Sequence, residues 1–116
     1  MTFALLSLLA CGPDCQSTCE HIHGDAAGQC DIQPPNTSPE NAIANCANEC
    51  DAAMREAGEV GDYDPNEQVS SNENIALENE RQAALWMECV MGSAGDGSDA
   101  TACEDLEKGI CAPIHH

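Results

Sequence analysis

Two pairs of cysteines, each with three residues between its members, constrain the fold of this chain more than any other sequence feature. Cys15 and Cys19 form the first pair, and Cys46 and Cys50 form the second. Residues four positions apart lie on one face of an α-helix, so each pair can present two sulfurs to a neighbouring helix. Two antiparallel helices would then be joined by two nested disulfides, Cys15–Cys50 and Cys19–Cys46, at Cα separations of about 5.5–6 Å.

This twin C-x3-C pattern is similar to that of the small chaperones of the mitochondrial intermembrane space. Their motifs lie closer together than the 26 residues between Cys19 and Cys46, and the sequence shows no long flanking helices of their kind. The resemblance therefore implies the stapled geometry and implies no chaperone activity.

The chain as a whole has the composition of a disulfide-stabilised domain. It has nine cysteines in 116 residues, but only one Phe, one Trp and one Tyr. Few large side chains bury little apolar area, and small domains with thin cores depend on disulfides or metals. Disulfides persist in oxidising places, so we expect an extracytoplasmic protein of the periplasm, a cell surface or a released virion.

The pairing of the other cysteines is open. Cys30, Cys89, Cys103 and Cys111 remain when the twin pairs and Cys11 are set aside, and four cysteines allow three pairings. We favour Cys89–Cys103, which would join the end of one predicted helix to the start of the next, together with Cys30–Cys111. Each disulfide would stabilise the fold by about 2–4 kcal/mol.

The remaining cysteine, Cys11, follows an apolar segment at the start of the sequence. Residues 1–10, MTFALLSLLA, carry no charge and are shorter than the roughly 20 residues that a membrane-spanning helix needs. Leu8-Leu9-Ala10-Cys11 resembles the lipobox of bacterial lipoproteins, which implies that Cys11 would receive a lipid. The alternative is a retained helix buried against a partner. We therefore expect an apolar signal, anchor or assembly segment at 1–10 and one disulfide-rich domain at 11–116.

Apolar residues recur at helical spacing, with no useful two-residue alternation, which predicts an all-α domain of four helices and long loops. The first helix should carry Pro13 in its first turn and end at Gly24. The others are expected at 39–57 after the N-cap Ser38, at 73–91, and at 102–108 after a capping box from Thr101 to Glu104.

The net charge of −18 excludes several partners. Only Arg55, Arg81 and Lys108 oppose 21 acidic residues. Binding to nucleic acid depends on Lys and Arg, as does docking on anionic lipid. We therefore expect no nucleic-acid partner, and membrane contact only through a lipid on Cys11. The charge favours solubility, basic partners, divalent cations or a salty medium.

One acidic loop, DYDPNEQVSSNE at 62–73, resembles the calcium-binding loop of EF-hands. Its oxygen-bearing residues at the ligand positions are Asp62, Asp64, Asn66, Gln68, Ser70 and Glu73. Glu67 stands where the EF-hand has its turn glycine, and Pro65 stiffens the loop, so an exposed loop is the leading interpretation. Calcium is the one cofactor that this loop could bind.

Other site chemistry finds little support in the sequence. Cys19, His21 and His23 have a spacing that matches no common zinc module, and the C-x-x-C-H signature of covalent haem is absent. No redox C-x-x-C, G-x-S-x-G, H-E-x-x-H or phosphate-binding glycine loop occurs. We therefore expect no catalytic residues and no enzymatic activity.

The run from CGPDCQSTC through GEVGDYDP to ENERQAALWMECV is similar to small cysteine-rich lipoprotein-like proteins of uncharacterised function from marine bacteria and their phages. The resemblance implies an extracytoplasmic, disulfide-bonded product in a salty medium. We expect a structural or interaction protein, an acidic surface component of an envelope or virion. Its contact to a protein partner or to copies of itself would be residues 1–10. The alternative is a secreted calcium-binding module that uses the 62–73 loop.

Overall fold

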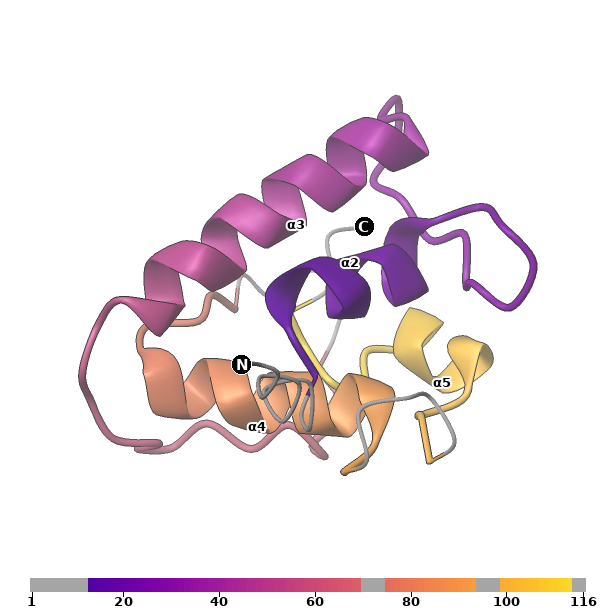
Figure 1. Ribbon diagram of the computed structural model, residues 1–116. Helices are drawn as coiled ribbons and strands as arrows, with labels where there is room; N and C mark the ends of the chain where they lie inside the picture. The colour runs from indigo at the N-terminus through magenta and orange to yellow at the C-terminus, as the bar shows by residue number, and fades with distance from the viewer. Residues whose placement is uncertain (1–12, 70–74, 94–98, 114–116) are drawn as a thin grey trace, which may run out of the picture.

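The structure, a computed structural model, describes residues 13–69, 75–93 and 99–113, and these residues form four helices and no strand (Figure 1). In chain order the helices are α2 (Cys15–His23), α3 (Pro39–Met54), α4 (Glu80–Met91) and α5 (Cys103–Glu107). The all-α, disulfide-stapled domain that the sequence predicts is confirmed. The predictions for residues 1–10 and for Cys11 lie outside the described residues.

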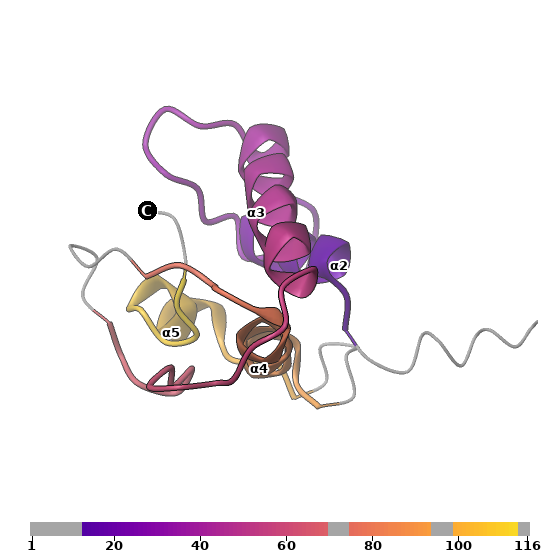
Figure 2. The same ribbon diagram turned by 90° about the vertical axis from the view of Figure 1, so that its left-hand side faces the viewer.

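The three longer helices form a wedge. In Figure 1, α3 and α4 lie close together at one end and diverge toward the other, and α2 fills the space between them, antiparallel to α3. Figure 2 looks along α4 and shows α2 packed beside α3, with α4 below this pair and α5 at its side. The connection after α3 runs around the outside of α4.

Side-chain caps begin α2 and α3. The Asp14 carboxylate accepts hydrogen bonds from the Ser17 amide and hydroxyl, both at 2.7 Å, and these bonds lower the pKa of the carboxyl. Pro13 therefore precedes the N-cap. The prediction that it lies in the first turn of the helix is wrong. The predicted cap of α3 is confirmed, because the Ser38 hydroxyl accepts from the Asn41 amide at 3.2 Å.

α3 is shorter than the predicted 39–57 helix, because it ends at Met54. The next two amides, of Arg55 and Glu56, form tight turns with carbonyls three residues back. The Glu56 carbonyl then accepts a hydrogen bond from the Glu80 amide at 2.8 Å, which joins the end of α3 to the start of α4. A tertiary hydrogen bond thus takes the place of another helical turn.

α4 begins later than the predicted 73–91 helix, because Asn79 is its N-cap. The Asn79 side-chain oxygen accepts from the amides of Arg81 at 3.0 Å and Gln82 at 3.1 Å. Its side-chain nitrogen donates to the Glu59 carbonyl at 2.9 Å. One buried amide side chain therefore caps α4 and ties it to the connection that follows α3.

The predicted helix at 102–108 is present as α5, but its predicted capping box does not form. Ala102 is the N-cap and makes no side-chain hydrogen bond. The Thr101 hydroxyl instead donates to the Cys89 carbonyl at 2.7 Å, which attaches the start of α5 to the last turn of α4. Leu106 is fully buried and joins α5 to the core.

The core combines a few large apolar side chains with sulfur. Trp86 is only 1% exposed, and Met87 is buried beside it on α4, as expected for core residues. The buried cluster also contains five cysteines and several aliphatic side chains: Cys15, Cys19, Cys46, Cys50, Cys111, Ile22, Ile32, Leu77, Val90 and Leu106. Cysteine sulfur therefore fills space that aromatic rings occupy in most cores of this size.

The double role of Asn79 predicts a large effect for a small substitution. Asn79→Ala should destabilise the fold by about 1–2 kcal/mol, since it removes the cap of α4 and the hydrogen bond to Glu59. Asn48→Ala, on the exposed face of α3, is the matched control and should change stability by less than about 0.5 kcal/mol. Urea unfolding of both variants measures the difference; equal midpoints would contradict the role assigned to Asn79.

Candidate functional site

The four disulfides are the most distinctive chemical groups of the described chain, and two of them staple α2 to α3 as the sequence predicts. Cys15 bonds to Cys50 with a Cα–Cα distance of 5.7 Å, and Cys19 bonds to Cys46 at 5.8 Å. All four residues are buried. The Cys50 sulfur also contacts the Met87 sulfur at 4.0 Å, so the staple is packed against α4.

The favoured pairing of the other four cysteines is wrong. Cys89 bonds to Cys111 rather than to Cys103, and Cys30 bonds to Cys103 rather than to Cys111. The prediction assumed that α5 stays beside the end of α4 where its own cysteine could reach Cys89. Two other segments decide the outcome instead: the tail that follows α5, and the loop that follows α2.

The tail after α5 folds back toward the connection that precedes α4. The Val69 amide donates to the Gly109 carbonyl at 3.1 Å, and the Cys111 amide donates to the Pro65 carbonyl at 2.9 Å. Gly109 has a φ of +105°, and a Cβ at this position would clash with the Val69 carbonyl, so the close approach requires glycine. These backbone contacts bring Cys111 to Cys89.

The loop after α2 folds back onto that helix. The amides of Cys30 and Ile32 donate to the carbonyls of His21 and Ile22 at 2.8 and 3.0 Å. This return places the Cys30 sulfur beside α5, where it bonds to Cys103, and 3.8 Å from Nε2 of His21. Burial lowers the pKa of His21, because the charged imidazolium loses hydration. Sequence spacing carries no signal for this arrangement.

Cys19 and His23 of α2 are both engaged in other bonds. The Cys19 sulfur is held in a disulfide, so it is no thiolate ligand. His23 is buried, and its Nδ1 is hydrogen-bonded to the Ile32 carbonyl. Within residues 13–69, 75–93 and 99–113, no three His, Cys, Asp or Glu side chains gather as a metal site.

The candidate calcium loop is described only in part, because Ser70 and Glu73 lie outside the described residues. Asp62 and Asp64 are exposed. The Asp64 carboxylate accepts a hydrogen bond from the Asn66 amide at 3.0 Å, which closes a short turn within the loop. The calcium hypothesis therefore stays a prediction.

The same loop is attached to the C-terminal tail through Tyr63. The Tyr63 hydroxyl donates a hydrogen bond to the Ala112 carbonyl. Burial and the neighbouring Asp64 carboxylate raise the pKa of the phenol, so it keeps its proton and its role as a donor. The first part of the acidic loop is therefore fixed at a tertiary contact.

A small cavity lies where α3 meets α4. Its volume is about 10 Å³, and its lining includes Trp86, Leu77, Glu49 and Pro113 beside the sulfurs of the staples. Trp86 Nε1 is buried and has no hydrogen-bond partner within the described part of the chain. A space of this size holds about one water molecule. It is too small for an organic substrate.

The disulfides place the protein in an oxidising, extracytoplasmic compartment. None of the helices described here has the length and apolar character needed to cross a membrane. Comparisons with protein-family models, with curated proteins and with solved structures found no match for the chain.

The disulfide pairing can be checked by cleaving the unreduced protein between its cysteines. Trypsin has three sites in the chain, after Arg55, Arg81 and Lys108. Combined trypsin and cyanogen bromide cleavage also cuts after Met87 and Met91. We expect fragment 88–91 to be joined to 109–116 through Cys89–Cys111. Fragment 92–108 should be joined to the N-terminal fragment that carries Cys30.

Mass spectrometry of the fragments separates all three possible pairings. The pairing favoured from the sequence would instead join 88–91 to 92–108. The third pairing would join 92–108 to 109–116. Either result would contradict the framework described above, and a reduced digest, in which every fragment separates, is the control.

Proposed function

We propose that this protein is a non-enzymatic structural component of an extracytoplasmic assembly, either an envelope lipoprotein or a minor or decorating virion protein. The observation that carries the proposal is the distribution of side chains between core and surface. The two α2–α3 disulfides and nearly all of the large apolar side chains are buried, and the chain is strongly acidic.

The distribution of the disulfides over the fold supports a structural role. Each of the four helices is joined by a disulfide to another part of the chain that is distant in sequence, with separations from 22 to 73 residues. Such bonds stabilise chiefly by restricting the unfolded chain. The fold can then tolerate self-repulsion from a net charge of −18, which would weaken a domain of this size held by packing alone.

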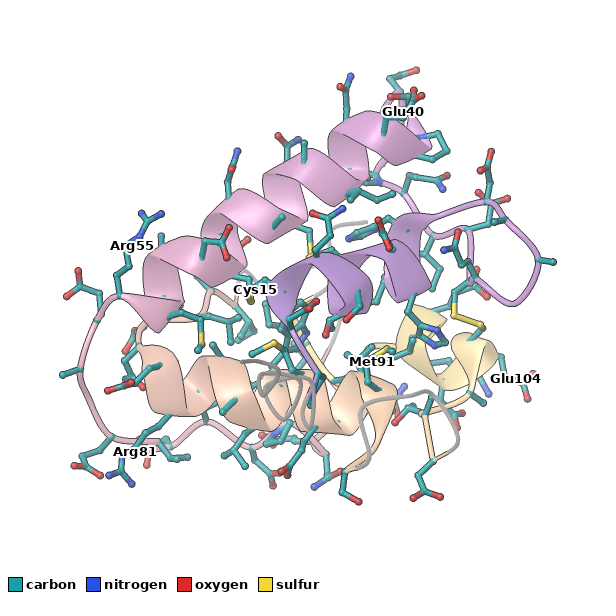
Figure 3. The ribbon with its side chains drawn as sticks, in the orientation of Figure 1. Cys15, Glu40, Arg55, Arg81, Met91 and Glu104 are labelled. Atoms are coloured by element: carbon teal, nitrogen blue, oxygen red, sulfur yellow. A yellow bond between two sulfur atoms is a disulfide. The ribbon has the colours of Figure 1, made fainter. Side chains whose placement is uncertain are left out.

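The described surface offers little for apolar association. Among the residues that the structure describes, Met54 is the exposed large hydrophobic side chain, at 43% exposure. Figure 3 shows charged side chains such as Glu40, Arg55 and Glu104 projecting outward from the helices. Residues 1–10, which are uncharged and leucine-rich, are therefore our candidate for an apolar contact with an assembly.

Replacing these leucines tests the proposal. The full chain, purified from its host, should fractionate with the envelope or with virus particles. Serine at positions Leu5, Leu6, Leu8 and Leu9 should release it as a monomer. Met54→Ser removes an apolar side chain from the described surface and should leave the distribution unchanged. Sedimentation and fractionation are the readouts.

Two results would overturn the proposal: a parent chain that is already a free monomer, or a serine variant that stays bound like the parent. Intact mass then distinguishes the two kinds of assembly. Loss of Met1–Ala10 with a diacylglycerol on Cys11 identifies a lipoprotein. Retained residues 1–10 identify a component whose apolar start contacts a neighbour.

The calcium-binding alternative makes a different prediction. If the 62–73 loop binds calcium, millimolar calcium should raise the melting temperature, and Asp62→Asn combined with Glu73→Gln should remove the effect. The structural proposal instead predicts equal, small effects of calcium and magnesium, because both only screen the acidic surface. Thermal melts of parent and double variant with each ion distinguish the two functions.

A further inference from the structure

The four disulfides differ in how accessible they are to an external reagent. Cys103 is exposed and Cys30 is half-buried. Each of the other three bonds has at least one sulfur on a residue that is at most 1% exposed: Cys50, Cys19 or Cys111. Figure 3 shows a sulfur–sulfur bond at the outer side of α5, facing the loop after α2, near the labelled Glu104.

A histidine lies beside the less exposed sulfur of this bond. His21 Nε2 is 3.8 Å from the Cys30 sulfur, so an imidazolium there could pair with a thiolate. Thiol–disulfide exchange is faster when the departing thiolate is stabilised, and a neighbouring His⁺ lowers the pKa of a thiol. Cys30 is therefore the better leaving group, and the sulfur of Cys103, the more exposed residue of the two, is the easier one to attack.

Several charged side chains on the surrounding elements also affect the charge state of His21 and Cys30. Glu20 precedes His21 on α2 and accepts a hydrogen bond from Gln16 at 2.9 Å, and Asp31 accepts one from Gln33 at 2.7 Å. The loop after α2 also carries Asp25, and α5 and its C-cap carry Glu104, Asp105, Glu107 and Lys108. The cause that lowers the pKa of His21 in the oxidised protein is burial. A Cys30 thiolate formed next to His21 would raise the pKa of the histidine, because its negative charge stabilises the imidazolium.

We propose that Cys30–Cys103 is a thiol-exchange site that accepts a cationic small-molecule thiol as a mixed disulfide on Cys103. A thiolate attacks the Cys103 sulfur and forms a new sulfur–sulfur bond. The Cys30–Cys103 bond breaks, and its electron pair goes to the Cys30 sulfur. The incoming thiol is oxidised, Cys30 is reduced to a thiolate, and His21 holds the proton that the incoming thiol lost.

The preference for a cationic thiol follows from charge. The net charge is −18, and α5 carries three carboxylates, at Glu104, Asp105 and Glu107, directly after Cys103. An anionic thiol is repelled as it approaches, whereas a thiol that also carries an ammonium group is not. The preference should weaken in high salt, which screens these exposed charges.

The fold can open this bond and keep its structure. α5 remains attached through buried Leu106, and Gln68 donates to the Lys108 carbonyl at 3.0 Å. The tail that follows α5 stays bound through Cys89–Cys111 and the hydrogen bond between Val69 and Gly109. The α2–α3 staples do not involve Cys30 or Cys103.

The test is timed reaction of the native, oxidised chain with cysteamine, followed by acid quench, alkylation and fragment mass mapping. We expect cysteamine on Cys103 and a free Cys30, formed at least about tenfold faster than any change at the other three bonds. At equal thiolate concentration and low salt, cysteamine should react faster than 3-mercaptopropionate, and high salt should narrow the difference.

The role of His21 has its own readout. In the cysteamine adduct, the pH dependence of Cys30 alkylation reports the pKa of the Cys30 thiol. We expect this pKa to lie below the ordinary thiol value of about 8.5. His21→Gln should return it toward that value and slow the exchange. Asn48→Ala, an exposed change on α3, is the control and should do neither.

Three outcomes would overturn the proposal. One is that another disulfide opens first, and a second is that cysteamine attaches to Cys30. The third is that His21→Gln, with unchanged helical circular dichroism, leaves both the rate and the pH profile as in the parent. None of these measurements depends on residues 1–10. A failure of the thiol-exchange proposal is therefore distinguishable from a failure of the assembly function proposed above.

Discussion

The two nested disulfides between α2 and α3 are the constraint on which the rest of the structure depends. α2 has only nine residues, and an isolated helix of that length is marginal in water. Two covalent bonds on one of its faces fix its distance, direction and rotation relative to α3. Ile22, on the same face, is thereby held in the core with Trp86, and the loop after α2 starts from a fixed position.

The remaining organisation follows from hydrogen bonds between segments rather than from apolar area. Asn79 binds the connection after α3, Thr101 binds the last turn of α4, and the tail after α5 pairs with the loop at Pro65 and Val69. Such bonds are individually modest. They suffice here because the cross-links have already removed much of the chain entropy that folding must overcome.

The sequence predicted the features that depend on residues close together in the chain, and it missed those that depend on contacts between distant segments. The C-x3-C spacing gave the α2–α3 staples, and Ser38-Pro39 gave the start of α3, because each feature acts within a turn or two of helix. The start of α4 and the pairing of Cys89 depend on contacts with distant backbone, at Glu59 and Pro65, which no spacing encodes. The position of His21 beside Cys30 escaped prediction for the same reason.

The order of the cysteines along the chain has a consequence for biosynthesis. A chain that enters an oxidising compartment N-terminus first can complete both α2–α3 bonds once Cys50 has emerged. Cys30 must then wait for Cys103, and Cys89 for Cys111, while other cysteines pass close by. An oxidant that joins cysteines in order of arrival would trap wrong pairs, so the final pairing depends on thiol–disulfide exchange that reshuffles early bonds.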